Sequence, residues 1–283
     1  MHKDISIVLP SYKSRELLIK HIKNLPKKIK IIIVENSYDK QTKKEIIKNF
    51  ANVKVILQKN IGYGCAINLG SNYVKTKYFL VMNPDTKIYQ NTISNLVKAA
   101  KKIKIFGALS PDQIKNKKKN KNKKKIYVKN QLDGGAMLFD TKIFKKIEGF
   151  DKNIFLYYEE NDYFHKCNIL KYKLYLVTNS YFYHSQKGDS SSAIFSNKKE
   201  KDYAKLIGGW HGQWSKFYYL KKYHGYWYSF YKCLPNLIVN IIQFIIKTLT
   251  FSKKTKYIYF KIEGLISSMI GIRSYKRNKY DEF

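Results

Sequence analysis

The sequence predicts an α/β fold, with a mostly parallel sheet covered by helices on both faces, and a helical C-terminal extension. Short apolar, β-rich runs alternate with helically spaced stretches through the first hundred residues. This alternation is typical of parallel sheets that are buried on both faces. Polar residues follow several of the apolar runs directly, where open α/β sheets bind their ligands. From about residue 205 the chain becomes aromatic and basic, and then strongly apolar over 233–251.

The elements are expected in a regular order. The expected strands are 5–9, 30–35, 53–57 and 78–82, and the helices between and after them lie near 15–24, 40–50, 64–75 and 91–103. Residues 115–125 form a lysine–asparagine tract, which predicts a solvated, disordered loop, with polyanion binding as the alternative. Patterning then resumes with a strand at 132–139, helices near 141–147 and 160–170, and a strand at 174–178.

The charge balance limits the classes of function. The chain has 55 Lys and Arg against 20 Asp and Glu, a net charge of +35 that suggests nucleic-acid binding. However, only Arg15, Arg273 and Arg277 are arginines, whereas nucleic-acid readers favour the bidentate guanidinium. The abundance of Ile, Asn, Tyr and Phe beside Lys indicates a bias toward A·T-rich codons. We therefore expect no nucleic-acid partner, while a sugar nucleotide, a lipid phosphate or a membrane surface remains compatible with the charge.

The cysteines and the N-terminus indicate the compartment. Cys65, Cys167 and Cys233 are widely separated and show no metal-ligand spacing, which fits a reducing compartment. The apolar run within residues 1–12 is too short for a signal peptide. We therefore expect the catalytic part to lie in the cytoplasm.

The first candidate site follows the apolar run 78–82. Pro84 ends that strand, and Asp85 is expected to be solvent-accessible beyond the sheet edge. A carboxylate there can bind a divalent cation that bridges a diphosphate, because hard cations prefer oxygen ligands. An ordinary Asx turn is the alternative, since Asn83, Pro84 and Asp85 are all turn residues.

Two further segments carry chemistry. In 60–70, Gly62 and Gly64 predict a tight turn that opens a helix and can face a phosphate. In 150–162, an aromatic run is followed by a predicted helix whose first turn carries three carboxylates, those of Glu159, Glu160 and Asp162. They suit helix capping, but a partly apolar setting can also raise a carboxyl pKa and supply a general base. His184, after the strand 174–178, is either a ligand or a core histidine.

Taken in order, these segments resemble family 2 glycosyltransferases of the GT-A fold, a Rossmann-like architecture, and in particular the rhamnosyltransferase-like branch. The likeness covers residues 4–225 and closes with WSKFYYLKKYHG (214–225). Its other matching segments are IVLPSYKSRELL (7–18), IIIVENSYDKQT (31–42), NIGYGCAINLG (60–70), FLVMNPDT (79–86), GGAMLF (134–139), GFDKNIFLYYEENDYFHK (149–166) and HSQKGDSS (184–191).

The resemblance implies a nucleotide site at the strand ends. The residues that it implies there are Pro10, Ser11, Tyr12, Glu35, Asn36, Asn60, Gly62 and Asn83. Two of them depart from the family pattern. Glu35 stands where the family usually has Asp, and Asn83 replaces the first Asp of the DXD-type motif, as is common in this branch.

The resemblance also implies a metal site, a base and an acceptor site. Asp85 matches the metal-binding Asp, and His184 matches a histidine that can complete the metal site. Glu159 and Glu160 match the family's Glu-Asp pair, whose second member is the base, so Glu160 is the expected base. Glu159 and Asp162 are the alternatives for that role. The residues that would border the acceptor are Asp133, Gly134, Gly135 and Ala136.

These implications predict a metal-dependent, inverting glycosyltransferase that uses Mg²⁺ or Mn²⁺. It would move a sugar, rhamnose by the branch, from a nucleotide diphosphate sugar to a hydroxyl of a glycan or lipid-linked acceptor in cell-surface polysaccharide synthesis. Two alternatives stay open: an inactive relative that acts as a scaffold, because Glu and Asn replace Asp at three positions, and a nucleic-acid-binding protein. The expected domains are 1–225, the GT-A domain, and 226–283, the helical extension.

The segment 233–251 has 19 residues, just enough to span a bilayer as a helix. Its polar residues recur at helical spacing, so they form one stripe: Asn236, Asn240, Gln243 and Lys247. A spanning helix would hold all four in hydrocarbon, which is unfavourable. The alternatives are a helix packed on the catalytic domain, an in-plane helix on the inner face of the membrane beside Lys232 and Lys253–Lys256, and a true span.

Overall fold

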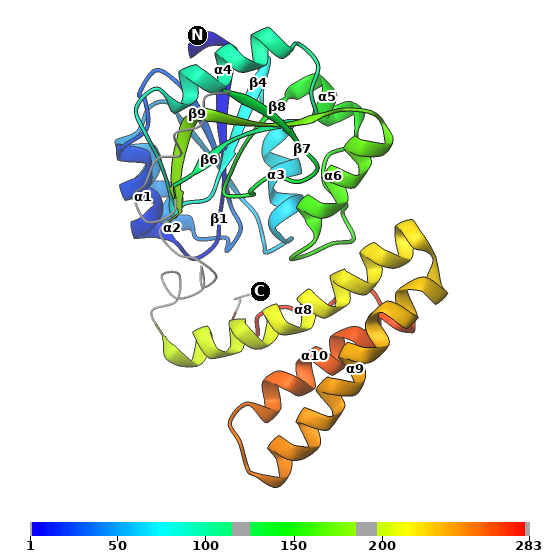
Figure 1. Ribbon diagram of the computed structural model, residues 1–283. Helices are drawn as coiled ribbons and strands as arrows, with labels where there is room; N and C mark the ends of the chain where they lie inside the picture. The colour runs from blue at the N-terminus through cyan, green and yellow to red at the C-terminus, as the bar shows by residue number, and fades with distance from the viewer. Residues whose placement is uncertain (1, 115–124, 185–196, 281–283) are drawn as a thin grey trace.

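The computed structural model describes residues 2–114, 125–184 and 197–280. An α/β half contains the sheet, and three long helices lie beneath it (Figure 1). A short 3₁₀ helix, η1 (His2–Asp4), precedes the first strand. Apart from Lys125, the predicted lysine–asparagine loop at 115–125 lies outside the described residues, as do residues 185–191 of the HSQKGDSS segment.

The first half of the sheet is parallel, as predicted. Its strands are β1 (Ile5–Ser11), β2 (Lys30–Glu35), β3 (Val53–Leu57) and β4 (Tyr78–Met82), in the spatial order β3-β2-β1-β4. The helices that connect them are α1 (Arg15–Lys23), α2 (Lys40–Asn49) and α3 (Tyr63–Ser71). Each lies where the apolar pattern predicts it, because continuous Ile, Leu and Val runs can be buried only in a sheet covered on both faces.

The second half of the sheet mixes directions. Its elements are β5 (Thr86–Ile88), α4 (Thr92–Ile103), β6 (Ala108–Gln113), β7 (Ile126–Lys129), β8 (Ala136–Asp140), α5 (Thr141–Lys146), α6 (Glu159–Ile169) and β9 (Leu174–His184). Strands β6 and β9 run with β1–β4, whereas β8, β5 and β7 run against them. The sequence pattern missed β5, β6 and β7, because β5 has three residues and β6 contains Pro111 and Asp112, which read as a turn.

Two apolar cores fill the two faces of the sheet. On one face, Ile5, Ile7 and Leu9 of β1 pack with residues of α1, α2 and α4. On the other face, Val8 of β1 joins a cluster with residues of α3, α5 and α6, which includes Phe139. Alternate side chains of a strand point to opposite faces. This packing holds the carboxyl ends of β1, β2 and β4 in fixed positions, and these ends carry the candidate site.

The helical part consists of α8 (Lys198–His224), α9 (Tyr226–Leu249) and α10 (Thr255–Met269). Trp210 of α8 packs with Phe260 of α10, and a Cβ on Gly264 would lie 2.2 Å from the Trp210 carbonyl oxygen, so the two helices approach closely. The predicted boundary falls at Gly225, between α8 and α9. Because α8 also packs against both following helices, the division into two domains stays a prediction.

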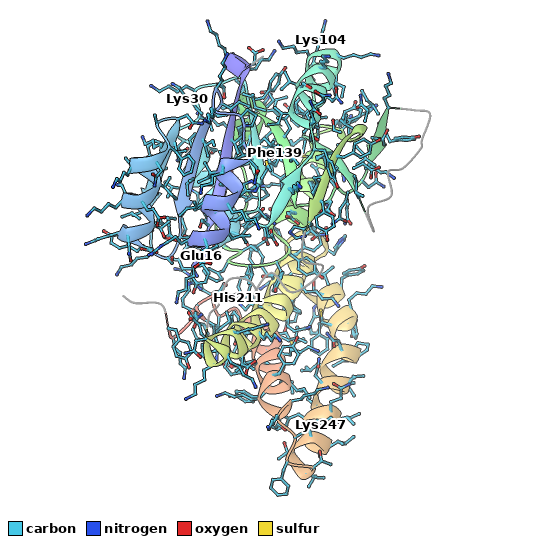
Figure 2. The ribbon with its side chains drawn as sticks, turned by 90° about the vertical axis from the view of Figure 1, so that its left-hand side faces the viewer. Glu16, Lys30, Lys104, Phe139, His211 and Lys247 are labelled. Atoms are coloured by element: carbon cyan, nitrogen blue, oxygen red, sulfur yellow. The ribbon has the colours of Figure 1, made fainter. Side chains whose placement is uncertain are left out.

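Figure 2 shows the hairpin of α9 and α10 projecting away from the α/β half, with Lys247 near its far end. By length and composition, α9 is the one helix among the described residues that could cross a membrane. After α10 the chain turns back toward the α/β half. The Trp214 indole donates to the Ile272 carbonyl at 2.8 Å, and His211 Nε2 lies 2.9 Å from the Lys276 carbonyl oxygen.

Candidate active site

A cavity of about 280 Å³ opens at the carboxyl ends of β1 and β4. The structure brings together nearly all of the residues predicted for the nucleotide. Those that line the cavity are Pro10, Ser11, Tyr12, Asn36, Asn60, Gly62 and Asn83. They come from four separate loops, which the parallel order of β1, β2, β3 and β4 places at one edge of the sheet.

A buried amide holds two of these loops together. The Asn36 side-chain NH₂ donates to Asn60 Oδ1 at 3.2 Å and to the Gly62 carbonyl at 3.3 Å, while its Oδ1 accepts from the Ile61 N–H at 3.2 Å. Gly62 has φ +91°, and a Cβ there would lie 2.3 Å from the Phe155 carbonyl oxygen. Only glycine fits this position, because the backbone is left-handed and the neighbouring loop is close.

Glu35 is placed differently from the prediction. Its carboxylate is buried and accepts from the backbone N–H of Ser37 at 3.0 Å and of Asp39 at 3.1 Å. Burial raises the pKa of Glu35. It does not line the cavity but orders the turn between β2 and α2, which carries Asn36.

Asp85 and His184 meet through the pairing of β5 with β9. Thr86 lies opposite His184 in this antiparallel pair, and His184 Nε2 lies 3.0 Å from Asp85 Oδ1. His184 is the last residue of β9 rather than a loop residue beyond a strand ending at 178. The Asp85 side chain is 8% exposed, so the expectation of an open, solvent-accessible carboxylate is wrong. The hydrogen bond to Asp85 raises the pKa of His184.

Glu160 is the second residue of α6, which follows a strained loop. Tyr157 and Tyr158 have φ +65° and +68°, a left-handed conformation that is uncommon outside glycine and clusters at functional sites. The Glu160 carboxylate lies directly over Gly134, where a Cβ would come within 1.6 Å of Oε1. Burial, followed by the negative charge of Asp133, raises the pKa of Glu160. A carboxylate in this environment is a stronger base than an exposed one.

The two alternatives to Glu160 have other surroundings. Glu159 is buried and its Oε2 has no hydrogen-bond partner within the described structure, and burial strongly raises its pKa, which favours the neutral acid. Asp162 accepts from Lys222 Nζ and from the Tyr223 hydroxyl on α8. Two residues along a helix point in nearly opposite directions, so Asp162 faces α8 when Glu160 faces Gly134. The structure does not bring Asp162 into the site.

The residues predicted to border the acceptor lie beside Glu160. Gly134 is directly beneath the Glu160 carboxylate, and Asp133 Oδ1 accepts from the Gly135 N–H at 2.9 Å. The Gly135 carbonyl in turn accepts from the Thr86 hydroxyl at 3.0 Å. The loop before β8 is therefore tied to the segment that carries Asp85.

Among the cavity residues that the sequence did not predict, Tyr63 and Asn278 form side-chain hydrogen bonds with predicted ones. The Tyr63 hydroxyl donates to Asn83 Oδ1 at 2.8 Å, and its place inside the 60–70 segment could have indicated it. Asn278 reaches the cavity from the C-terminal end of the chain, with its side-chain NH₂ 3.4 Å from the Tyr12 hydroxyl. No sequence pattern signals such a return.

A second, open hollow of about 1740 Å³ adjoins the first, and Tyr63 and Asn83 line both. It begins at Glu160 and runs past α8 at Gly208, Gly209 and Gly212. Beyond α8 it is lined by lysines, which include Lys253, Lys254, Lys256 and Lys261. We call it the basic groove. Two of these glycines let tyrosines approach α8 closely: a Cβ on Gly208 would lie 3.1 Å from the Tyr157 hydroxyl, and one on Gly209 would lie 2.7 Å from the Tyr257 ring.

The two residues Asp85 and His184 offer one carboxylate oxygen and one imidazole nitrogen, which are suitable ligands for Mn²⁺ or Mg²⁺. Across the residues that the structure describes, no group of three or more His, Cys, Asp or Glu side chains could hold a metal ion. Within the described ranges, Asp85 and His184 are therefore a pair of candidate ligands and not a complete coordination shell.

The chain belongs to glycosyl transferase family 2, whose family model matches residues 6–176. No curated protein sequence gives a significant match. Among solved structures, the chain is similar to GalNAc-T7 with UDP, GalNAc and Mn²⁺, at 16% identity and TM-score 0.54, over 77% of this chain and 50% of that one. The chain therefore spans about half the length of that protein.

Two other solved structures match nearly the whole chain. The mannosyltransferase PcManGT from Pyrobaculum calidifontis, in complex with GDP-Man and Mn²⁺, has 11% identity and TM-score 0.57, over 94% of this chain and 87% of that one. S. aureus TarS 1–349, in complex with UDP-GlcNAc, has 13% identity and TM-score 0.54, over 95% and 92%. At these identities the likeness establishes the GT-A glycosyltransferase fold, which confirms the predicted fold class.

Proposed function

We propose that this glycosyltransferase is an inverting enzyme that moves a sugar from a nucleotide diphosphate sugar to an acceptor hydroxyl. One observation carries the proposal: Glu160, a carboxylate with a raised pKa, lies over Gly134 where the nucleotide-sized cavity adjoins the basic groove. A donor in the cavity and an acceptor in the groove would meet at this carboxylate.

Glu160 is the proposed base. It accepts the proton of the acceptor hydroxyl as the oxygen attacks the anomeric carbon, and the nucleotide diphosphate leaves from the opposite face, which inverts the configuration. The raised pKa makes Glu160 a better proton acceptor near neutral pH. Asn36, Asn60 and Tyr12 hold the donor so that the attacking oxygen and the leaving group stay in line.

Asp85 and His184 are the proposed metal ligands. Their oxygen and nitrogen atoms fit a divalent cation, Mg²⁺ or Mn²⁺, and diphosphate oxygens of the donor would complete the coordination. The bound cation supplies charge neutralisation for the leaving diphosphate. The presence of Mn²⁺ in the structures of GalNAc-T7 and PcManGT supports this assignment.

The identities of the sugar, the donor and the acceptor are also proposals. The segments that resemble the rhamnosyltransferase-like branch favour rhamnose as the sugar, and the bound UDP and GDP compounds of the structural neighbours favour a nucleotide sugar donor. We propose a glycan or lipid-linked acceptor in cell-surface polysaccharide synthesis, on the inner face of the cell membrane. Residues 1–225 would form the catalytic domain and 226–283 the extension.

A donor screen tests the proposal. Thermal shift with UDP-, GDP- and dTDP-sugars, each with and without Mn²⁺, should show one nucleotide that stabilises the protein, since a ligand bound only by the folded state raises its stability. That donor should then be hydrolysed slowly in a metal-dependent reaction. No stabilisation and no hydrolysis with any donor would instead favour the inactive scaffold.

A further inference from the structure

Helix α9 has its apolar side chains on the outside. Seven of its large aliphatic residues are exposed. Val239 is one of them, and the spacing of the other six places them on one face: Ile238, Ile241, Ile242, Ile245, Ile246 and Leu249. Trp227 and Tyr231 lie eleven and seven residues before Ile238, which extends the same face to the start of the helix. We call these eight residues the outer face of α9.

The polar stripe predicted on this helix begins on the opposite, protein-facing side. Asn240 is buried, and its side-chain NH₂ donates to Asn236 Oδ1 at 2.8 Å. The Asn236 side-chain NH₂ donates to Gln213 Oε1 of α8, also at 2.8 Å. A helix built to face water would have the reverse arrangement, with its amides outside and its isoleucines inside. A continuous apolar face of this length marks an interaction site.

The segment after α9 adds charge to this apolar face. Phe251 is 96% exposed, and Lys253, Lys254 and Lys256 follow it, with no acidic residue between 250 and 260. Aromatic side chains favour the boundary between lipid and water, and lysines near that boundary attract anionic headgroups. The hairpin projects from the body of the molecule (Figure 2), so nothing in the α/β half covers this end.

We propose that the outer face of α9, together with residues 250–256, docks in the plane of an anionic lipid bilayer. A second copy of the chain fits less well, because each copy carries a net charge of +35 and would bring like-charged lysines together. A transmembrane position would require Asn236 and Asn240 to leave Gln213 or to carry α8 into the hydrocarbon.

The docking surface meets the basic groove at Lys253, Lys254 and Lys256, which line both. The groove leads from these lysines to Glu160. The role of this connection in catalysis rests on the proposed function: an acceptor held in the membrane by its lipid would enter the groove at its basic end. The docking itself depends on no catalytic step.

Vesicle flotation of the full chain tests the inference. Wild type should float with vesicles of phosphatidylcholine and phosphatidylglycerol, float weakly with phosphatidylcholine alone, and lose binding at high salt by screening. Ile242→Glu combined with Ile245→Glu should abolish flotation. Ile47→Glu combined with Ile105→Glu is the matched control, because these isoleucines are also at least half exposed but lie on the α/β half, and it should float like wild type. Each Lys→Glu change at 253, 254 or 256 should lower partitioning at least about fivefold.

Four outcomes would overturn the proposal. The first is that wild type does not float with anionic vesicles, and the second is that the two isoleucine pairs have equal effects. The third is that the chain does not bind vesicles but forms a dimer that only the α9 pair disrupts. The fourth is that membranes retain the chain after an alkaline carbonate wash, as they retain a transmembrane helix. Donor hydrolysis in solution separates this proposal from the proposed function. If wild type floats but hydrolyses no donor, the docking surface stands and the proposed function is wrong. If it hydrolyses a donor but does not float, the proposed function stands and the docking surface is wrong.

Discussion

The α/β half and helix α9 use apolar side chains in opposite ways. In β1, Ile7, Val8 and Leu9 are fully buried between two layers of helices, whereas Leu249 at the end of α9 is 74% exposed. Burial of apolar area stabilises the first region by about 25 cal/mol per Å². The outer face of α9 gains no such stabilisation from the fold. The exposed apolar face of α9 therefore has to be explained by something other than the stability of the fold.

The polar side chains of the two regions also differ in what surrounds them. In the α/β half, Asn36, Asn83 and Glu160 border hollows at the edge of the sheet. In the helical part, Asn240 is enclosed between helices. Changes at the sheet edge should therefore alter chemistry, and changes on the outer face of α9 should alter only where the protein resides.

The largest expected effect is on turnover. Glu160→Gln keeps the shape of the side chain and loses its basicity, so transfer should fall by about 10²–10⁴ while donor binding persists. The control Asp162→Asn should weaken the contact with Lys222 on α8 and retain turnover in the folded protein. Initial-rate assays with donor titration measure both. A dead Asp162→Asn beside a near-normal Glu160→Gln would move the base to Asp162.

The same Leu→Ala substitution in each region compares how much a leucine contributes to stability there. Leu80→Ala in β4 removes a fully buried side chain and should cost about 2–5 kcal/mol of unfolding free energy. Leu249→Ala removes an exposed side chain and should change it by less than about 0.5 kcal/mol. Urea denaturation measures both. Equal costs would mean that the outer face of α9 is packed, and the contrast between the regions would disappear.

The metal response sharpens the assignment of the sheet edge. Asp85→Ala removes the charged ligand and should weaken Mn²⁺-dependent donor binding by more than the roughly 10–100-fold seen for residues that only orient a ligand. His184→Ala should have a smaller effect, because a neutral imidazole contributes no charge. Calorimetric titration of donor with and without Mn²⁺ measures this. If His184→Ala lowers only the melting temperature, the histidine is structural.

The smallest effect concerns stability and pH. Burial raises the pKa of Glu159 from 4.5 to about 8, so the folded state favours its neutral form. The stability that this proton contributes is complete below the unfolded pKa and is lost as pH rises toward the folded pKa. Glu159→Gln cannot ionise, so the variant should match the unfolding free energy of wild type near pH 4 and exceed it above pH 8. A parallel pH dependence of the two melting temperatures would contradict this.

Much of the fold could be predicted because its signals are local. The apolar runs at 5–9 and 78–82 form β1 and β4, and Gly62 forms the turn before α3. The gathering of Pro10, Asn36, Asn60 and Asn83 around one cavity was also predictable, since parallel strands present their carboxyl ends at one edge. The short strands β5 and β7 were not, because their stability comes from pairing with β9 rather than from their own sequence.

Local sequence specifies the alternation of strands and helices, the polar residues that follow β1 and β4, and the polar stripe of α9, since each depends on neighbours a few residues away. The partners of the polar side chains depend on how distant segments pack. Asp85 meets His184 across 99 residues, and Asn278 meets Tyr12 across 266. Glu35 turned inward to Ser37, and Asp162 turned to Lys222. A carboxylate binds whichever donors the fold places beside it when water is excluded, and that choice is made only when distant segments pack together.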